Sequence, residues 1–539
     1  MDFTSFRKNA RPSAAEAAKL QANFKKQCKK AASALYEANV LIVVTGAGFS
    51  AYSGLAVYAD VANVPAYRNL GVSYHDLCQP HWLQAAPSLF FGFWGQCFND
   101  YRVTKPHNGY NIIAKWRDDK NNPDNVNNVK HKKSKKCKKT IADRIRKRIR
   151  KERGKDDEDD DAPAFLKTPA YPVQGDPAGA FFCYTSNVDA HWFDVCHAQE
   201  IHECHGNVEL WQCADPYECG SGIWRAPVEH RFLVDQETME APPSKSTTTT
   251  THACTPSPPS TGSSSEEEEE ENSDDDSIDR IFQKLDVQKK KPYDWEKHRR
   301  KLEVQNNPDF YDWEDHRRKR KRNQSNHKQG SRAPKRQKIN HNSSNDNVKA
   351  TPVVVPVIGH VLGKGDRTNL LQHMPATANP YQWRTTTTTP GSEDATKTDN
   401  WPKCAKCHSL ARPAILMFQD TDWLPDQAQE ERWSLWVHSI LKLCKKHNKK
   451  HNLKVCILEI GCGMNVPTCR VESERLADSI LEHGGKVQLI RINPDFPLTS
   501  FLDAPDDAII PIMSRGLQAI EKMDHYYNKL QRKQNKKKG

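Results

Sequence analysis

The chain has 539 residues, of which 36% are apolar and 27% are charged. This balance argues against one compact globule and predicts a folded core interrupted by disordered segments. The sequence contains no run of about 18 apolar residues and starts without the apolar centre of a signal peptide, so we expect no membrane span and no secretion. The 16 cysteines are then expected to be reduced thiols or metal ligands rather than disulfides.

The net charge of +12 suits an acidic partner such as nucleic acid or a chromatin protein, although solubility alone also accounts for it.

A helix, a buried strand and a packed helical region are predicted in the first part of the chain. Residues 13–38 begin with the capping-box pair Ser13 and Glu16 and continue with Ala- and Lys-rich turns, which predicts a helix. The run VLIVVT (40–45) is continuously apolar, as is typical of a parallel strand covered on both faces. Residues 74–116 are rich in aromatic side chains and are predicted to form packed helices.

Two stretches have the composition of insertions. Residues 117–164 combine a strongly basic run with DDEDDD, and residues 236–400 contain Thr, Ser/Glu and Pro/Ser tracts, so we expect both to be mostly disordered. The second stretch contains an imperfect repeat, YDWEKHRRK (293–301) and YDWEDHRRK (311–319), which is a candidate peptide motif. Basic clusters at 319–322 and 334–338 indicate nuclear import, with a cytoplasmic enzyme as the alternative.

The fold is predicted to resume near residue 401. An amphipathic helix at 429–447 precedes two further buried strands, within KVCILEIGCG (454–463) and KVQLIRIN (486–493). Strands that alternate with helices predict an α/β fold with a doubly wound, Rossmann-like parallel sheet.

Glycines and a polar side chain follow three of these strands. They are TGAGFS (45–50), Gly461–Gly463 and Asn493. Ligands of an open parallel sheet bind beyond the carboxyl ends of its strands, and glycine lets the backbone approach a pyrophosphate. One glycine turn is as often structural as functional, but three such strand ends together favour a nucleotide site.

A fourth strand end carries polar groups suited to catalysis. The segment CYTSNVDAHW (183–192) contains Asn187, Asp189 and His191, and ECHGNVELWQC (203–213) follows with His205 and a glycine. A single histidine is more often a core or surface residue than a catalyst. Because imidazole titrates near neutral pH, the His-Gly pair after the S-N-V-D segment nevertheless makes His205 a candidate general base.

Two cysteine pairs predict one structural zinc ion. The pairs are Cys213 with Cys219 and Cys404 with Cys407, and four thiolates suit tetrahedral zinc. The long separation between the pairs adds little entropic cost. Cys219 is the weakest member because its spacing from Cys213 is wide, so Cys204 and His408 remain substitutes. A redox role for the C-x-x-C pair is the alternative.

We therefore expect a small zinc-binding module inserted in the sheet domain, together with the long disordered insertions. The expected boundaries are 1–116 for the first Rossmann-like part, 117–164 for the charged insertion, 165–203 for the next Rossmann-like part, 204–235 for the first half of the zinc module, 236–400 for the low-complexity insertion, 401–425 for the second half of the zinc module, 426–526 for the last Rossmann-like part and 527–539 for a basic tail.

The chain resembles the sirtuins, a family of NAD-dependent protein deacylases. GAGFSAYSGL resembles the family's GAGxSxxSGI, TSNVD its TQNID, and the His-Gly pair at 205–206 its catalytic pair. CAKCHSLARPAILMFQD resembles the second zinc pair and the segment that follows it, while EIGCGMNVP and RIN resemble later cofactor segments. PHNGY (106–110) resembles a motif of a divergent microbial branch. The motifs occur in the family's order over about 60% of the chain.

The resemblance implies residue roles. The catalytic residues would be His205, Asn187 and Asp189. NAD would be bound by Gly46, Ala47, Gly48, Phe49, Ser50, Ser53, Tyr58, Ser186, Asn187, Asp189, Gly461, Cys462, Gly463, Asn493 and Ala508. The acyl oxygen of a modified lysine would displace nicotinamide, His205 would take a proton from a ribose hydroxyl, and the acyl group would pass to ADP-ribose. The substrate, such as a histone, would lie as a strand beside the segment that starts at Arg412 and Pro413.

Several positions depart from the family pattern. Val57 and Ala59 replace a polar Asp and Arg, Ser186 replaces Gln, Ala190 replaces a frequent Gly, and Cys462 and Gly463 replace Thr and Ser. These losses predict weaker NAD binding or an altered acyl preference. Two alternatives to a deacylase stay open: a protein mono-ADP-ribosyltransferase on the same scaffold, and a regulatory protein that binds NAD or ADP-ribose with little or no catalysis.

Overall fold

The structure is a computed structural model that describes residues 10–56, 62–122, 140–153, 175–227, 230–243, 399–447, 453–499 and 508–536. All of them belong to one compact unit, formed by Met1–Tyr293 and His373–Gly539. The repeat at 293–319, the basic clusters at 319–322 and 334–338, and the end of the basic tail at 537–539 lie outside the described residues. Among the described helices, none has both the length and the apolar character that a membrane crossing needs.

Nine strands are found in the described residues, in two sheets. They are β1 (Val40–Thr45), β2 (Phe181–Thr185), β3 (Ile201–Glu203), β4 (Gly206–Cys213), β5 (Trp224–Arg225), β6 (Ala411–Ile415), β7 (Lys454–Ile460), β8 (Lys486–Ile492) and β9 (Ile509–Ile512). The larger sheet has the order β3-β2-β1-β7-β8-β9, and every neighbouring pair is parallel. The three predicted strands are confirmed as β1, β7 and β8, and β1 lies near the centre, as its continuous apolar run predicts.

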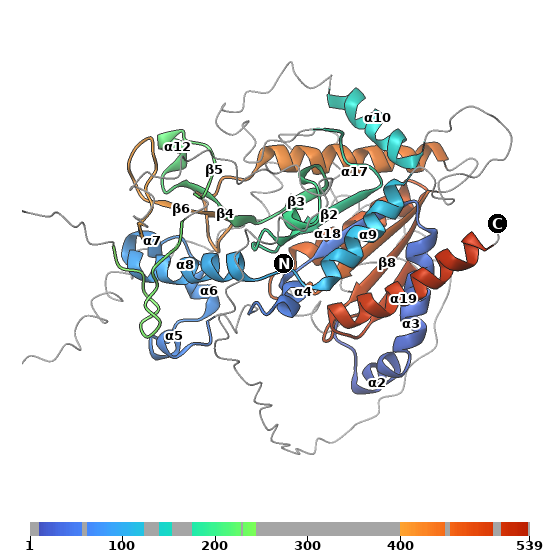
Figure 1. Ribbon diagram of the computed structural model, residues 1–539, viewed down its shortest axis with the longest axis horizontal. Coiled ribbons are helices and arrows are strands. Elements are labelled where there is room, and N and C mark those ends of the chain that lie inside the picture. The colour runs from blue at the N-terminus through green and yellow to red at the C-terminus, as the bar shows by residue number, and fades with distance from the viewer. Residues whose placement is uncertain are drawn as a thin grey trace, which may run out of the picture. The chain divides into compact units, whose positions relative to one another are not determined.

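The helices surround both sheets (Figure 1). They are α2 (Ala14–Ala22), α3 (Phe24–Glu37), α4 (Ala47–Ser50), α5 (Pro65–Asn69), α6 (Tyr74–Leu77), α7 (Trp82–Ala85), α8 (Pro87–Val103), α9 (Asn108–Asn121), α10 (Ile141–Arg153), α12 (Pro216–Cys219), α17 (Gln427–His447), α18 (Thr468–Glu482) and α19 (Gly516–Asn535), with short 3-10 turns η1 (Ala51–Ser53), η4 (His191–Asp194) and η5 (Ala198–Glu200). The predicted helix at 13–38 is present as α2 and α3, which meet at Asn23, and Ser13 and Glu16 form the predicted capping box.

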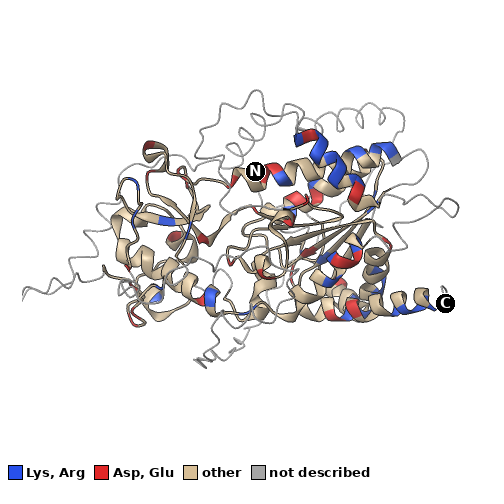
Figure 2. Ribbon diagram, turned by 45° about the horizontal axis from the view of Figure 1, so that its top comes forward, with Lys and Arg blue, Asp and Glu red and all other residues tan. Residues whose placement is uncertain are grey.

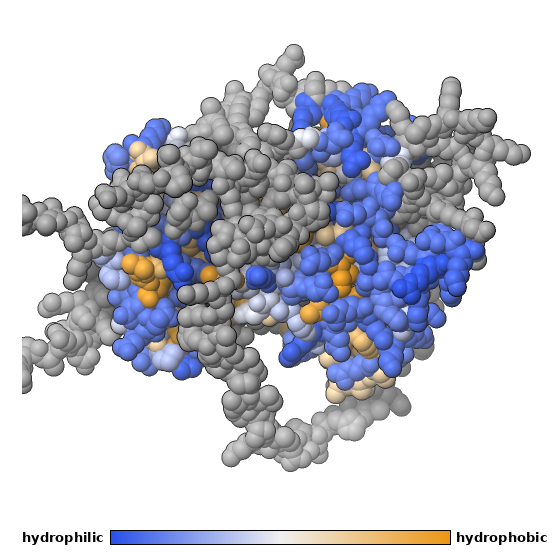
Figure 3. All heavy atoms as spheres, in the orientation of Figure 1, coloured by the Kyte–Doolittle hydropathy of each residue, from blue (hydrophilic) through white to orange (hydrophobic). Residues whose placement is uncertain are grey.

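The parallel sheet is covered on both faces, so the predicted doubly wound architecture is confirmed. Helices α3, α9 and α19 pack on one face, where alternate strand residues such as Leu41 and Val43 are buried. Helices α17 and α18 pack on the other face against Val40, Ile42 and Val44. This alternation follows the two-residue repeat of a strand. Figure 3 shows a largely hydrophilic face, as expected when most apolar side chains lie in these layers.

The smaller sheet has the order β5-β4-β6 and is antiparallel. It shares an aromatic cluster with α8, in which Phe91, Phe98, Trp211 and Ile415 are buried. Helices α5 to α8 therefore belong with this module and not with the first Rossmann-like part, where the boundary 1–116 had placed them. Sequence composition could not show this, because an aromatic helix suits either layer.

Two insertion boundaries also need correction. Residues 117–164 were predicted as one disordered insertion, but α9 extends to Asn121 and α10 lies within the stretch. Ile145 and Ile149, one turn apart, are buried in the layer that α17 forms, while most of the basic residues of α10 are exposed; Figure 2 shows Lys and Arg in blue. Residues 236–243, predicted as insertion, continue the small module, where the Ala241 N–H donates to the carbonyl of Ser88 at 2.9 Å.

Candidate functional site

The glycines after β1 bring two strand ends into direct backbone contact. The Gly46 N–H donates to the Ile460 carbonyl, and the Gly48 N–H donates to the Gly461 carbonyl, both at 3.1 Å. A Cβ atom on Gly46 or Gly48 would stand 2.9 Å from the Gly461 oxygen. Gly461 itself has φ +66°, and its own Cβ would stand 2.4 Å from the Phe49 nitrogen. These glycines are thus explained by the close approach of β1 to β7, whatever ligand lies beyond them.

Three of the predicted site residues form one buried cluster just past this contact. The Ser50 hydroxyl donates to Asp189 Oδ2 at 2.5 Å and accepts from Asn187 Nδ2 at 2.9 Å. The Tyr110 hydroxyl lies 3.1 Å from Ser50 Oγ, and burial keeps the pKa of Tyr110 well above its usual value, so the phenol remains a donor. Ser50 is the last residue of α4, which follows β1, while Asn187 and Asp189 follow β2. The structure therefore brings together residues that the sequence separates widely.

Asn187 holds an acceptor that the protein does not use. Its side chain is buried at 5% exposure, and its Oδ1 atom has no hydrogen-bond partner. A buried polar group without a partner is costly, so such a group often marks the place of a ligand. The unpaired atom is an amide oxygen, so its partner must be an N–H or O–H donor. A ligand carboxamide would satisfy it.

A second buried chain of hydrogen bonds fixes the backbone under Asn187. The Asn187 N–H donates to Thr185 Oγ1 at 3.1 Å, and this hydroxyl in turn accepts from Thr45 Oγ1 at 2.8 Å. Trp192 Nε1 donates to Thr45 Oγ1 at 2.9 Å. Thr45 and Thr185 are the last residues of β1 and β2 and lie side by side. These hydrogen bonds therefore hold together the two strand ends that carry the cluster.

The PHNGY motif supports the segment that follows β1. His107 Nε2 lies 2.9 Å from the Phe49 carbonyl, and its Nδ1 accepts the Gly109 N–H at 3.0 Å. The His107 backbone N–H donates to Ser53 Oγ at 3.1 Å. Burial lowers the pKa of His107, which fits a neutral ring that donates from Nε2. His107 is also the N-cap residue of α9, so its hydrogen bonds tie the predicted Phe49 and Ser53 to that helix.

The His-Gly pair lies between the two sheets, where β3 ends and β4 begins. Gly206 has φ +69°, and a Cβ there would stand 1.9 Å from the Ala414 carbonyl oxygen. The His205 carbonyl accepts the Leu416 N–H at 3.0 Å. His205 is half-buried and comes two residues after the end of β3, which pairs in parallel with β2 so that Glu203 lies opposite Thr185. The candidate base therefore lies at the same strand ends as the Asn187 cluster.

The neighbouring His191 is a structural residue by its contacts. It is fully buried, its Nε2 lies 3.2 Å from the Tyr101 carbonyl, and its backbone N–H donates to Asp189 Oδ1 at 3.0 Å. Its contribution to the site is to orient Asp189.

On the β7–β8 side, the predicted residues organise a loop. Asn493 Nδ2 donates to the Cys462 carbonyl at 2.9 Å, and its Oδ1 accepts the N–H groups of Asp495 and Phe496, both at 2.9 Å. Gly463 is half-buried, with nothing within 4 Å of the position of a Cβ. Asn493 thus holds the two loops that follow β7 and β8.

Other predicted residues are placed individually. Ala47 is half-buried at the start of α4, and Ala508 is buried just before β9. Ser186 is half-buried, and its N–H donates to the Thr45 carbonyl at 3.1 Å. Tyr58, together with the divergent Val57 and Ala59, lies outside the described residues.

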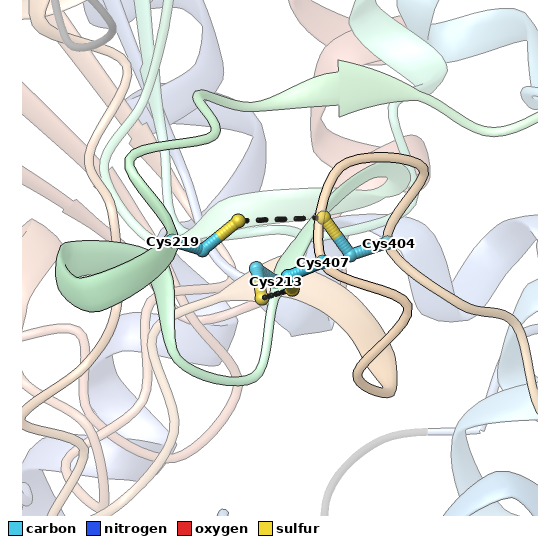
Figure 4. A group of neighbouring side chains, drawn as sticks. All are labelled: Cys213, Cys219, Cys404 and Cys407. Atoms are coloured by element: carbon cyan, nitrogen blue, oxygen red, sulfur yellow. Dashed lines mark hydrogen bonds between the residues drawn. The ribbon is translucent and has the colours of Figure 1, made fainter.

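The four predicted metal ligands form one cluster (Figure 4). Their sulfur atoms all lie within 4.8 Å of one another, with 3.4 Å between Cys213 and Cys407 and 3.7 Å between Cys219 and Cys404. Four sulfurs at zinc–sulfur distances of about 2.3 Å in a tetrahedron stand about 3.8 Å apart. Cys219 therefore belongs to the set in spite of its wide spacing, and the substitutes Cys204 and His408 are not needed.

Backbone N–H groups lower the pKa values of Cys407 and Cys404 in this cluster, whereas burial raises the pKa of Cys213. Cys213 ends β4, Cys219 ends α12, and the other two lie on the turn before β6. A backbone hydrogen bond from Ser409 lowers the pKa of Cys407 to about 6, so this sulfur ionises readily. No open ligand position is left among four cysteines, so a zinc ion bound here would be structural.

No protein-family model matches the sequence, and no curated protein matches it. Solved structures similar to this chain include a Sir2 homologue–NAD complex, with 11% identity, a TM-score of 0.37 and coverage of 93% of this chain and 94% of that chain. A mutant Sir2 homologue with ADP-ribose has 11% identity, a TM-score of 0.34 and coverage of 93% and 96%. A Sir2–p53 peptide–NAD+ complex has 11% identity, a TM-score of 0.32 and coverage of 92% and 95%. All three are structures of Sir2 proteins.

Proposed function

We propose that this protein is an NAD-dependent protein-lysine deacylase. The observation that carries the proposal is the cluster of Ser50, Asn187 and Asp189 at the carboxyl ends of β1 and β2, with the Asn187 Oδ1 atom buried and without a partner. Motif residues that the sequence separates by more than a hundred positions meet there in hydrogen-bonding contact. The carboxyl edge of a doubly wound sheet is also where a dinucleotide is expected.

The residues present fit NAD. The unused Asn187 oxygen suits the N–H of a carboxamide, the group that nicotinamide carries, and Asp189 beside it supplies a second acceptor. When bound, NAD supplies nicotinamide as the leaving group and ADP-ribose as the acceptor of the acyl chain. The backbone contact between the loops after β1 and β7 leaves both loops close to the cofactor edge, although α4 has only four residues and provides no helix dipole of its own.

His205 is assigned the role of general base. Its imidazole takes up a proton from a hydroxyl group, a task worth about 10²–10⁴ in rate. Gly206 gives the ring its position, because the backbone conformation at 206 and the Ala414 carbonyl leave no room for a side chain there. The acylated lysine arrives on an extended peptide that pairs as a strand next to β6. A histone substrate and a nuclear location remain predictions from the sequence.

The test is nicotinamide release from NAD by the full chain with an acetyl-lysine peptide. His205→Ala should lower the rate at least about 100-fold, whereas His525→Ala, an exposed histidine on α19, should leave it unchanged. Equal rates in the parent and His205→Ala would overturn the role of the imidazole. Label from NAD fixed to protein would instead support ADP-ribosyl transfer, and NAD binding without any release would support a regulatory protein.

A further inference from the structure

Helix α10 combines a buried apolar face with a high positive charge. Seven of its thirteen residues are Lys or Arg, and only two are acidic. Ile141, Ile145 and Ile149 recur at every fourth position and are buried in the layer that α17 forms. Because a helix makes one turn in about 3.6 residues, this spacing uses one face for packing and leaves the charges on the others. The helix therefore adds a dense group of cations to the surface of the folded unit.

Four of these cations lie along one side of the helix. They are Arg144, Lys147, Arg148 and Lys151, and residues three or four positions apart are neighbours on a helix surface. Arg148 is half-buried, and the other three are exposed. Lys147, Arg148 and Lys151 form no ion pair with any residue that the structure describes. The charge of these three residues is therefore not neutralised by the described part of the protein.

The end of α17 continues this positive surface. Glu152 Oε1 of α10 lies 3.2 Å from Lys442 Nζ of α17, so the C-terminal parts of the two helices adjoin. Lys445 and Lys446 lie on the same side of α17 as Lys442, three and four positions further on, and both are exposed. Figure 2 shows Lys and Arg in blue along α10 and at this end of α17. Together these cations form the α10–α17 basic surface, which comprises Arg144, Lys147, Arg148, Lys151, Lys445 and Lys446.

The density of charge on this surface matches a nucleic-acid duplex. Residues 144 to 151 span about 10 Å of helix axis, a length over which a DNA duplex carries about six negative charges. An extended acidic peptide advances about 3.3–3.6 Å per residue, so it carries at most about three charges over the same length. Arginine also binds phosphate through two parallel hydrogen bonds. The surface therefore favours the phosphates of a duplex over an acidic peptide.

Two other anionic partners fit this surface less well. A helix that lies on a lipid surface inserts its apolar face, but the apolar face of α10 is buried within the protein. Proteins that bind single strands stack the bases on aromatic side chains, and α10 contains no aromatic residue. Contacts of Lys and Arg with phosphates carry no sequence information of their own. The chemistry of the surface is therefore that of sequence-independent duplex binding.

We propose that the α10–α17 basic surface binds the phosphate backbone of double-stranded nucleic acid without sequence preference. The Lys and Arg side chains contact phosphates and release the counterions that the duplex holds, which gives dissociation constants of about 10⁻⁴–10⁻⁶ M at physiological salt. The net charge of +12 adds a long-range attraction to the same partner. The proposal does not rest on the proposed deacylase activity, because α10 and α17 contain none of the predicted catalytic or cofactor-binding residues.

The test measures binding of the full chain to a fluorescently labelled DNA duplex of mixed sequence, by anisotropy and over a series of salt concentrations. The variant neutralises three cations of the basic surface and leaves the buried isoleucines unchanged: Lys147→Gln, Arg148→Gln and Lys151→Gln. The control neutralises three exposed cations of α19, which covers the other face of the sheet: Lys529→Gln, Arg532→Gln and Lys533→Gln. Both proteins lose the same charge and retain every other basic stretch of the chain, so only the location of the change differs.

The basic-surface variant should bind at least about tenfold more weakly than the parent, and its slope of log affinity against log salt should be smaller in magnitude by about 2–3, because three phosphate contacts are lost. The α19 control should bind nearly as tightly as the parent, and melting temperatures verify that all three proteins are folded. Absence of binding by the parent, or equal weakening in the two variants, would overturn the proposal. Tighter binding of poly-glutamate or of a single DNA strand than of the duplex would overturn the choice of partner.

Discussion

Gly206 fixes the candidate base through its own backbone. Its φ of +69° lies in the left-handed region, and the Ala414 carbonyl oxygen occupies the place where a Cβ would be, at 1.9 Å. The glycine of the His-Gly pair is thus required by the close antiparallel pairing of β4 with β6, and its neighbour His205 takes its position from that pairing.

Gly206→Ala should therefore destabilise the protein strongly. Left-handed backbone costs an alanine about 1–2 kcal/mol, and the clash with Ala414 adds to this, so we expect a loss of at least about 2 kcal/mol in the free energy of unfolding. Gly463→Ala is the control, because no atom lies within 4 Å of its Cβ position and its φ is not positive. Chemical denaturation measures both, and equal stability of the two variants would contradict this explanation of Gly206.

Residue identity and residue position differ in how well the sequence predicts them. Asn187, Asp189 and Ser50 were predicted from short motifs, and the structure places them in one cluster. Gly46 and Gly48 were predicted to face a pyrophosphate, yet their closest contacts are to the Gly461 turn. A motif identifies the residues that a site needs. It does not reveal a backbone contact between two distant segments, because neither segment alone contains the information.

At the scale of elements, β6 is held by a buried ion pair. Arg412 donates from both terminal nitrogens to Asp420, at 2.7 and 2.8 Å, and the two residues are 1% and 5% exposed. Arg412 was predicted to lie at the start of the segment that lines the peptide cleft. Its guanidinium is buried in the module and pairs with Asp420.

Asp420→Asn should cost about 3–5 kcal/mol in the free energy of unfolding, because it leaves the Arg412 charge buried without its partner. Asp422→Asn is the matched control two residues away, since the Asp422 side chain is exposed. Thermal or urea unfolding of both variants provides the measurement. A cost for Asp420→Asn no larger than that for Asp422→Asn would mean that the ion pair does not stabilise this module.

The contact between β3 and α17 contains a titratable core residue. His202 on β3 is 4% exposed and stacks with Trp433 of α17, with 6.2 Å between the ring centroids. Burial lowers the pKa of His202 from its usual 6.5 to about 4, although Glu472 and Asp426 oppose the shift. His202 Nε2 also lies 3.5 Å from Glu430 Oε2. The ring is therefore neutral at neutral pH, as a residue of the helix–sheet contact should be.

Acid should weaken this contact. Because the folded pKa of His202 is the lower one, the unfolded chain binds more protons between pH 6.5 and about 4, so the free energy of unfolding falls as the pH is lowered through this window. The full contribution is about 3 kcal/mol at most. His202→Gln removes it, so the variant should lose less stability than the parent between pH 6.5 and about 4. Identical pH profiles for the two proteins would contradict the assignment.

The elements themselves were largely predictable, and the exceptions have physical causes. Continuous apolar runs identified β1, β7 and β8, because strands buried on both faces have no polar alternation. Helix α10 was missed because its many charges concealed the spacing of Ile145 and Ile149. The affiliation of α8 was also beyond prediction, since an aromatic helix packs equally well on a parallel sheet or on a small antiparallel one.

At the scale of the whole molecule, the described residues that precede and follow residues 244–398 are in direct contact. Asn400 Nδ2 donates to the Pro242 carbonyl at 2.8 Å, and Trp401 Nε1 donates to the Ala241 carbonyl at 2.9 Å. The two ends of the stretch thus lie side by side on the small module. The cysteine pairs that precede and follow this stretch meet in the same module.

Replacement of residues 244–398 by a short Gly/Ser linker should leave the fold intact. A shorter loop costs less closure entropy, so we expect the melting temperature to stay the same or rise slightly, with one zinc ion retained per chain. Calorimetry and metal analysis measure the two quantities. A large fall in the melting temperature, or loss of zinc, would show that the replaced stretch contributes to the folded unit.

The most direct test of the proposed deacylase is the stoichiometry of its products. The full chain would be incubated with NAD and an acetyl-lysine peptide, and free lysine peptide, nicotinamide and the acetylated form of ADP-ribose would be quantified by mass spectrometry. The proposed function predicts that the three appear in equal amounts. Free lysine peptide formed without nicotinamide, or nicotinamide formed without free lysine peptide, would contradict it.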